Sequence, residues 1–184
     1  MAINSYYKSP LTIYVIWHPR NELGLAFGEA IYKTFCRDAE SPLIRSLSIP
    51  VRFRFVYEND RNTPIDIPLD ESDHNAIILL ADNELFEDDN WQPYIESLLE
   101  MQKNNAYTRI FPVALSDYAF SIHHDLSKKQ FINLIGFLKD GTDQLAKALA
   151  ELKSRLLHDL CRMLYHIEQV SDVSGQAINP AGAL

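Results

Sequence analysis

The residues best suited to chemistry lie in one acidic stretch that follows a run of apolar residues. Residues 77–81 are consecutive apolar side chains, a run typical of a strand buried on both faces of a parallel sheet. In open α/β sheets, ligands bind beyond the carboxyl ends of the strands. The polar and aromatic residues that follow this strand are therefore expected at a binding edge: Asp82, Asn83, Glu84, Glu87, Asp88, Asp89 and Trp91.

A second group of polar residues follows another apolar run, residues 11–17. His18 comes directly after it, and an imidazole there could contact a phosphate or a ribose. Arg20 could bind a pyrophosphate through two parallel hydrogen bonds. In the acidic stretch, Asp82 could accept hydrogen bonds from ribose hydroxyls. Each of the three residues also has a structural interpretation, because residues after a strand often cap a loop or a turn.

The elements that must position these residues alternate between strands and helices. Apolar runs and period-two alternation predict strands at residues 11–17, 50–57, 75–81, 109–115 and 131–135. Apolar side chains at helical spacing, or a place between two predicted strands, predict helices at 22–38, around 91–101, at 117–126 and at 143–167. Alternating elements imply parallel βαβ units, so the expected fold class is α/β: a flavodoxin-like, five-stranded parallel sheet flanked by helices, with a long terminal helix.

The length and composition suit one domain. The chain has 184 residues, 47% of them hydrophobic and 23% charged, and its net charge of −8 argues against a nucleic-acid-binding surface. No apolar run approaches the roughly 18 residues that a membrane span requires, and the N-terminus lacks a signal pattern. We expect one domain over residues 1–169 and a linker-like tail over 170–184 that leads to a further domain.

Cysteine and histidine usage points to neither disulfides nor a metal site. Cys36 and Cys161 lie far apart without CxxC spacing, as expected of reduced thiols in a cytoplasmic protein. His123, His124 and Asp125 are adjacent but lack partner ligands at zinc spacing, so we predict no metal. Neither a Gly-rich phosphate loop nor a GxSxG motif occurs, which argues against Rossmann dehydrogenases, P-loop enzymes and α/β-hydrolases.

Four further features occur in an order that carries a resemblance. They are the strand ending in Trp17-His18-Pro19, the long Pro-containing loop at 58–73, the acidic turn leading to Trp91, and Phe111-Pro112-Val113-Ala114-Leu115. Over residues 11–149 the chain resembles a Toll/interleukin-1 receptor (TIR) domain, particularly the divergent bacterial kind found as effector modules in antiphage systems. The resemblance implies a TIR-like fold, a 58–73 loop that mediates self-association and closes over a ligand, and a C-terminal sensor domain as partner.

The resemblance also implies an activity, because many TIR domains cleave the nicotinamide glycosidic bond of NAD. Nicotinamide is a cationic leaving group, so the barrier lies mainly in forming an oxocarbenium-like ribose, which a carboxylate stabilises. Glu96 matches the family's catalytic glutamate by type and region, and Trp91 matches an aromatic wall that stacks on a ring of NAD. NAD is the substrate and no cofactor is expected. The remaining substrate-binding residues are expected to be His18, Arg20, Glu58 and Asp82.

The helical register around Glu96 leaves two functions open. Enzymatic TIR domains usually show Trp-x-x-x-Glu, whereas here Ile95 occupies the fourth position after Trp91 and Glu96 the fifth. One residue rotates a helical side chain by about 100°. A Glu96 that points into a cleft with Trp91 predicts an NAD glycohydrolase activated by self-association. A Glu96 that projects into solvent predicts a non-enzymatic adaptor that acts by homotypic assembly. The fallback carboxylates are Glu58, Glu84 and Glu87.

Overall fold

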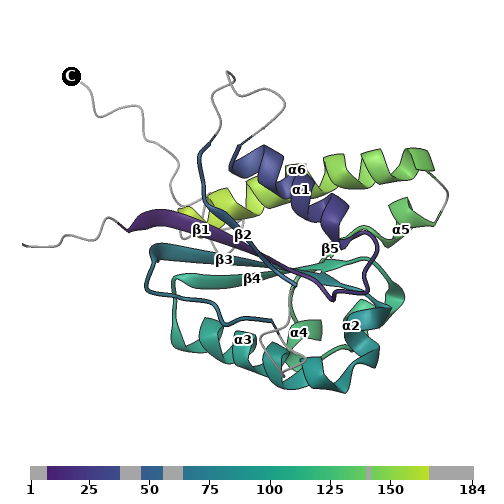
Figure 1. Ribbon diagram of the computed structural model, residues 1–184, viewed down its shortest axis with the longest axis horizontal. Coiled ribbons are helices and arrows are strands. Elements are labelled where there is room, and N and C mark those ends of the chain that lie inside the picture. Colours follow the sequence, from purple (N-terminus) through teal and green to yellow (C-terminus); the bar gives the residue numbers. More distant parts are fainter. Residues whose placement is uncertain (1–7, 38–46, 56–63, 140–141, 166–184) are drawn as a thin grey trace, which may run out of the picture.

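The computed structural model describes residues 8–37, 47–55, 64–139 and 142–165. These residues form an α/β domain built on a five-stranded, all-parallel sheet in the order β2-β1-β3-β4-β5 (Figure 1). The predicted flavodoxin-like sheet topology is confirmed. Its strands are β1 (Ser9–Ile16), β2 (Val51–Arg54), β3 (Ser72–Ala81), β4 (Thr108–Ala114) and β5 (Ile132–Asn133).

The helices lie on both faces of the sheet (Figure 1). They are α1 (Gly24–Phe35), α2 (Asn83–Glu87), α3 (Gln92–Asn104), α4 (His124–Ser127), α5 (Ile135–Leu138) and α6 (Thr142–Leu164), with short 3₁₀ helices η1 (Asp89–Trp91) and η2 (Asp117–Ser121). Helices α1 and α6 cover one face, whereas α2, α3 and α4 cover the other. The long helix α6 belongs to the domain because it buries one stripe of side chains at helical spacing: Ala148, Leu152, Leu156, Leu160 and Met163.

Strand β3 is the centre of the sheet and confirms the buried strand expected from the sequence. It pairs with β1 on one side and with β4 on the other. All residues from 75 to 81 are buried, as two-sided coverage requires. The strand begins at Ser72, three residues earlier than predicted, because Ser72 pairs with Ser9 at the start of β1. The acidic stretch therefore starts at the carboxyl end of the most buried strand.

Two of the predicted strands differ in extent from the strands of the structure. β2 spans Val51–Arg54, and residues 56–57 of the predicted 50–57 strand lie outside the described residues. β5 covers only Ile132–Asn133, because Asn133 Oδ1 accepts a hydrogen bond from the backbone N–H of Ile135 at 3.0 Å and the chain turns into α5. The sheet is consequently narrow at the β5 edge.

The helix boundaries also differ from the prediction. The first helix begins at Gly24, because Asn21 Oδ1 accepts from Leu23 N–H at 2.9 Å and forms a turn ahead of it. The predicted 117–126 helix is divided into η2 and α4. Trp91 lies in η1, and α3 starts one residue later with Pro93 in its first turn.

Pro112 is compatible with strand β4 because of the side to which its nitrogen points. The carbonyl of Ala114 accepts from Leu134 N–H on the β5 side, and Ile110 N–H donates to the Gln102 side chain. Alternate residues point their backbone groups to the same side of a strand, so the nitrogen of Pro112 also faces away from β3. Pro112 therefore removes no hydrogen bond between β4 and the centre of the sheet.

Two of the predicted features lie on residues that the structure does not describe. Residues 58–63 of the expected self-association loop, with Glu58, and the tail at 170–184 lie outside the described residues. Among the helices that the structure describes, none is both long enough and apolar enough to cross a membrane.

Candidate functional site

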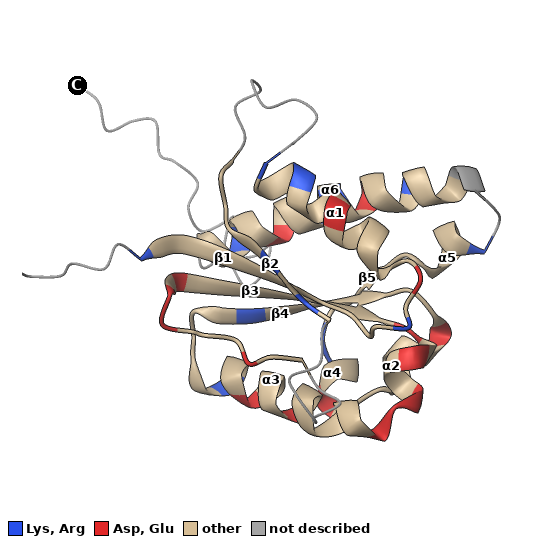
Figure 2. Cartoon of the chain, viewed as in Figure 1, with Lys and Arg blue, Asp and Glu red and all other residues tan. Residues whose placement is uncertain are grey.

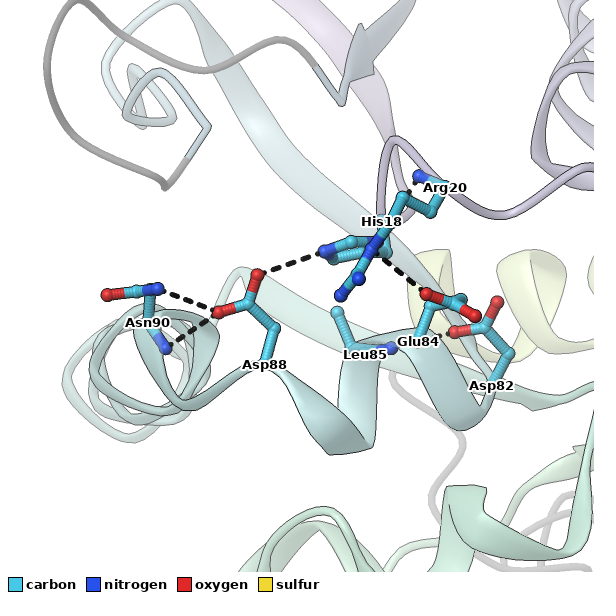
Figure 3. Close-up of polar contacts among 7 residues, drawn as sticks. All are labelled: His18, Arg20, Asp82, Glu84, Leu85, Asp88 and Asn90. Carbon is cyan, nitrogen blue, oxygen red and sulfur yellow. Dashed lines mark hydrogen bonds and ion pairs between the residues drawn. The ribbon is translucent and has the colours of Figure 1, made fainter.

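Six polar residues gather at the edge of the sheet formed by the carboxyl ends of β1 and β3 (Figure 3). We call them the carboxyl-edge cluster, and the acidic colouring of α2 in Figure 2 marks its place. Parallel strands end at the same edge, so residues 18–20 and 82–90 meet there although they are far apart in sequence. The cluster consists of His18, Arg20, Asp82, Glu84, Asp88 and Asn90.

His18 is the buried centre of the cluster. Its side chain is fully buried, and its Nε2 lies 3.2 Å from Oδ2 of Asp88. Its Nδ1 accepts a hydrogen bond from the backbone N–H of Arg20 at 3.2 Å. Because Nδ1 acts as an acceptor, the ring proton is on Nε2 and is donated to Asp88. His18 therefore joins the end of β1 to the turn between α2 and α3.

Asp88 is held as a carboxylate by several donors. Its Oδ1 accepts from the backbone N–H of Asn90 at 3.0 Å and from the side-chain amide of Asn90 at 2.8 Å. Desolvation alone would raise the pKa of Asp88, but the hydrogen bonds from Asn90 and His18 outweigh it and lower the pKa below its ordinary value. An ionised Asp88 fixes the orientation of the imidazole.

Arg20 and Glu84 form the part of the cluster that is most open to solvent. Arg20 Nε lies 3.0 Å from Glu84 Oε2, and the side chains are 60% and 26% exposed, respectively. An ion pair in contact with water contributes at most about 1 kcal/mol to stability. A ligand with its own charges can therefore separate Arg20 from Glu84 at little energetic cost.

Asp82 acts as the N-terminal cap of α2. Its Oδ1 accepts from the backbone N–H of Leu85 at 2.9 Å, and the residue is only 7% exposed. Burial raises the pKa of Asp82, while the hydrogen bond from Leu85 partly opposes that rise. This geometry matches the capping interpretation of Asp82, whereas its contact with a ribose stays a prediction.

Trp91 packs against His18 on the core side of the carboxyl-edge cluster. Its side chain is fully buried, its ring lies 5.3 Å from the His18 ring, and it packs edge-on against Tyr94 at 5.8 Å. In this structure Trp91 is thus a core residue behind His18 and offers no exposed wall for stacking on a ligand.

Glu96 lies elsewhere in the molecule. Ile95 is 1% exposed and faces the sheet, so Glu96, one residue later, is exposed on the outer side of α3. There it lines a cavity of about 530 Å³ together with His123, Asp125 and Lys129. The structure therefore does not bring Glu96 and Trp91 into one pocket. Glu87, another fallback carboxylate, is exposed on α2.

Asp88 and Asn90 are the members of the carboxyl-edge cluster whose contacts the sequence did not reveal. The acidic turn drew attention to Asp88, but its pairing with His18 spans 70 positions. Nothing in a single sequence signals such a contact.

Among the residues that the structure describes, no group of three or more His, Cys, Asp and Glu side chains is arranged to hold a metal ion.

Comparisons with protein-family models, with curated proteins and with solved structures gave no match to this chain. The fold and the cluster thus define a class only: a five-stranded, parallel α/β domain of flavodoxin-like topology with a polar cluster at its carboxyl edge.

Proposed function

We propose that the chain is a TIR-like effector domain of a bacterial defence or signalling protein, and that it cleaves NAD at the carboxyl-edge cluster when it self-associates. The observation that carries the proposal is the Arg20–Glu84 pair. It places a cation suited to a pyrophosphate beside a carboxylate suited to a ribosyl cation, at the edge where α/β sheets bind ligands. The proposal transfers the catalytic role from Glu96 to the fallback carboxylate Glu84.

The chemistry requires few groups. The bond between ribose C1′ and the nicotinamide nitrogen breaks, and its electron pair neutralises the positive charge of the nicotinamide. Glu84 stabilises the positive charge that develops on the ribose. A water oxygen then bonds to C1′, and its proton passes to the solvent. The proposed step consumes one NAD and one water and needs no metal.

In the proposed mechanism, Arg20 couples the binding of NAD to the release of the Glu84 carboxylate. Without a ligand, the guanidinium of Arg20 neutralises the carboxylate of Glu84. A pyrophosphate would compete for the guanidinium, since bidentate pairs of arginine with phosphate are strong. Binding of NAD would thereby release the Glu84 carboxylate for the ribose. His18 and Asp88 would hold the loop that carries Arg20 in place.

The test is nicotinamide release from NAD by concentrated, self-associated protein, followed by chromatography. Glu84→Gln preserves shape and removes charge, so it should lower the rate by about 100-fold or more. Glu87→Gln is the matched control, because Glu87 is an exposed glutamate on the same helix, and its rate should equal that of the unmodified chain. Equal rates for the two variants would refute the role of Glu84.

A second candidate function is a TIR-like adaptor that acts by homotypic assembly without cleaving NAD. The specific observation in its favour is the exposed position of Glu96 beside a fully buried Trp91. Light scattering over a range of protein concentrations, with NAD measured in the same samples, separates the two candidates. Assembly with intact NAD supports the adaptor, whereas assembly with nicotinamide release supports the enzyme.

A further inference from the structure

A polar cavity lies beside β4, where the outer strand β5 is short. β4 spans Thr108–Ala114, but β5 pairs only with Val113 and Ala114. The first half of β4 is therefore not covered by a fifth strand. A cavity of about 150 Å³ opens beside this uncovered part, the space of roughly five water molecules at about 30 Å³ each. Its lining includes Arg109, Ile110 and Phe111 from the amino end of β4, the end away from the carboxyl-edge cluster.

Two side chains from different elements are fixed at this cavity. Gln102 of α3 accepts the backbone N–H of Ile110 at 3.1 Å with its Oε1, which replaces the missing strand partner. The same Oε1 accepts from Lys129 Nζ at 2.9 Å. The ammonium group of Lys129 is thus positioned by a neutral amide and keeps two donor hydrogens for other partners. Its neighbour Lys128 instead pairs with the carboxylate of Asp125 at 2.8 Å.

The lining of the cavity is strongly basic for this protein. Arg109 of β4, Lys129 and Arg162 of α6 line it together with a single carboxylate, Asp159. Arg109 is the second residue of β4. Three cations converge here although the whole chain carries a net charge of −8. Burial, and then the nearby charge of Arg109, lower the pKa of Lys129. The charges of Arg109 and Lys129 repel each other, and an anion between them would relieve that repulsion.

A larger cavity adjoins the basic one. It measures about 530 Å³, which lies in the range of ordinary small-molecule sites, and it shares Gln102 and Lys129 with the smaller cavity. Its other polar lining residues include Glu96 and Glu100, whose carboxylates accept hydrogen bonds from hydroxyl groups, and His123. Nδ1 of His123 already accepts from the backbone N–H of Asp125 at 3.1 Å, so its Nε2 is a donor. The two cavities together match a ligand with a small anionic end and a larger, uncharged, hydroxyl-bearing part.

We propose that these joined cavities bind a small phosphate-bearing molecule, with the phosphate between Arg109, Lys129 and Arg162 and the organic part beside Glu96 and His123. This site is separate from the carboxyl-edge cluster, so it does not depend on NAD cleavage. It assigns Glu96 to ligand binding at this second site.

The test is isothermal titration of the full chain with inorganic phosphate, with adenosine monophosphate (AMP) and with adenosine. Phosphate should bind, AMP should bind more tightly than phosphate by about tenfold or more, and adenosine should give no heat. Substitutions Arg109→Met and Lys129→Met should each weaken the binding of AMP by about tenfold, since each removes a charged hydrogen-bond donor. Lys153→Met is the matched control and should leave the affinity unchanged, because Lys153 is an exposed lysine of α6 and lines neither of the two cavities.

Circular dichroism and the midpoint of thermal unfolding establish that each variant is folded. No binding of phosphate and AMP at millimolar concentration by the unmodified chain would overturn the proposal. Unchanged affinity for AMP in folded Arg109→Met and Lys129→Met would overturn it as well. Equal affinities for phosphate and AMP would overturn the assignment of the larger cavity to the organic part.

Discussion

Replacing Gly24 with alanine should test how the end of β1 is held in place. The Trp17 ring lies directly over Gly24, and a Cβ added there would stand 2.1 Å from Cδ1 and 2.5 Å from Cγ of Trp17. Real Cβ atoms do not approach other heavy atoms so closely, so either the indole or helix α1 must move. The indole has little room, since it also stacks on Phe55 at 4.5 Å and meets Phe53 edge-on at 5.3 Å.

Overpacking a filled core usually costs about 1 to 3 kcal/mol. For a domain of this size, each kcal/mol lowers the midpoint of thermal unfolding by about 2 to 4 °C. Gly24→Ala should therefore lower the midpoint by about 2 to 12 °C in a calorimetric scan. Gly136→Ala is the matched control: no atom lies within 4 Å of its added Cβ, so the midpoint should stay or rise slightly. Equal midpoints for the two variants would show that the Trp17 packing described here is wrong.

Three further predictions concern the cap of α2, the charge of Asp88 and the packing of α6. Asp82→Ala removes the acceptor for Leu85 N–H and should lower the free energy of unfolding by about 0.5 to 2 kcal/mol in urea titrations, with Asp82→Asn closer to the unmodified chain. Asp88→Asn should destabilise the protein near pH 7. The folded-state pKa of Asp88 is lowered from 3.8, so the stability that its charge contributes is present above pH 3.8 and is lost as the pH falls through the folded-state pKa. The difference in unfolding free energy between Asp88→Asn and the unmodified chain should therefore shrink as the pH is lowered from 4. A difference that stays constant would argue against an ionised Asp88. Leu156→Ala, in the buried stripe of α6, should cost about 2 to 5 kcal/mol, whereas Leu157→Ala, 49% exposed, should change stability by less than about 0.5 kcal/mol; similar losses would mean that α6 packs through another face.

The sheet was predictable because its signals are local. The apolar run at residues 77–81 has a length and composition that suit a strand buried on both faces, and the structure buries all of it. The meeting of His18 and Arg20 with the acidic stretch followed from topology alone, since parallel strands end at one edge. A general rule of α/β sheets thus brought together residues that are more than 60 positions apart, such as Arg20 and Glu84.

The details of the site depended on contacts that periodicity does not describe. The start of α3 is determined by the 3₁₀ turn that Asp88 caps through the N–H of Asn90, and this turn places Trp91 in the core. The register that then turns Ile95 inward and Glu96 outward depends on that cap, which a sequence pattern does not reveal. The short β5 has a similar cause, because one side-chain hydrogen bond of Asn133 ends it.

The most direct test of the proposed function compares Glu84→Gln with Glu96→Gln in the same nicotinamide-release assay, using concentrated protein and NAD. Glu84 lies in the carboxyl-edge cluster, whereas Glu96 lies on the outer side of α3. We predict that Glu84→Gln loses about 100-fold or more of the rate and that Glu96→Gln keeps it. Full activity in Glu84→Gln, or loss of activity only in Glu96→Gln, would contradict the placement of the reaction at the carboxyl edge.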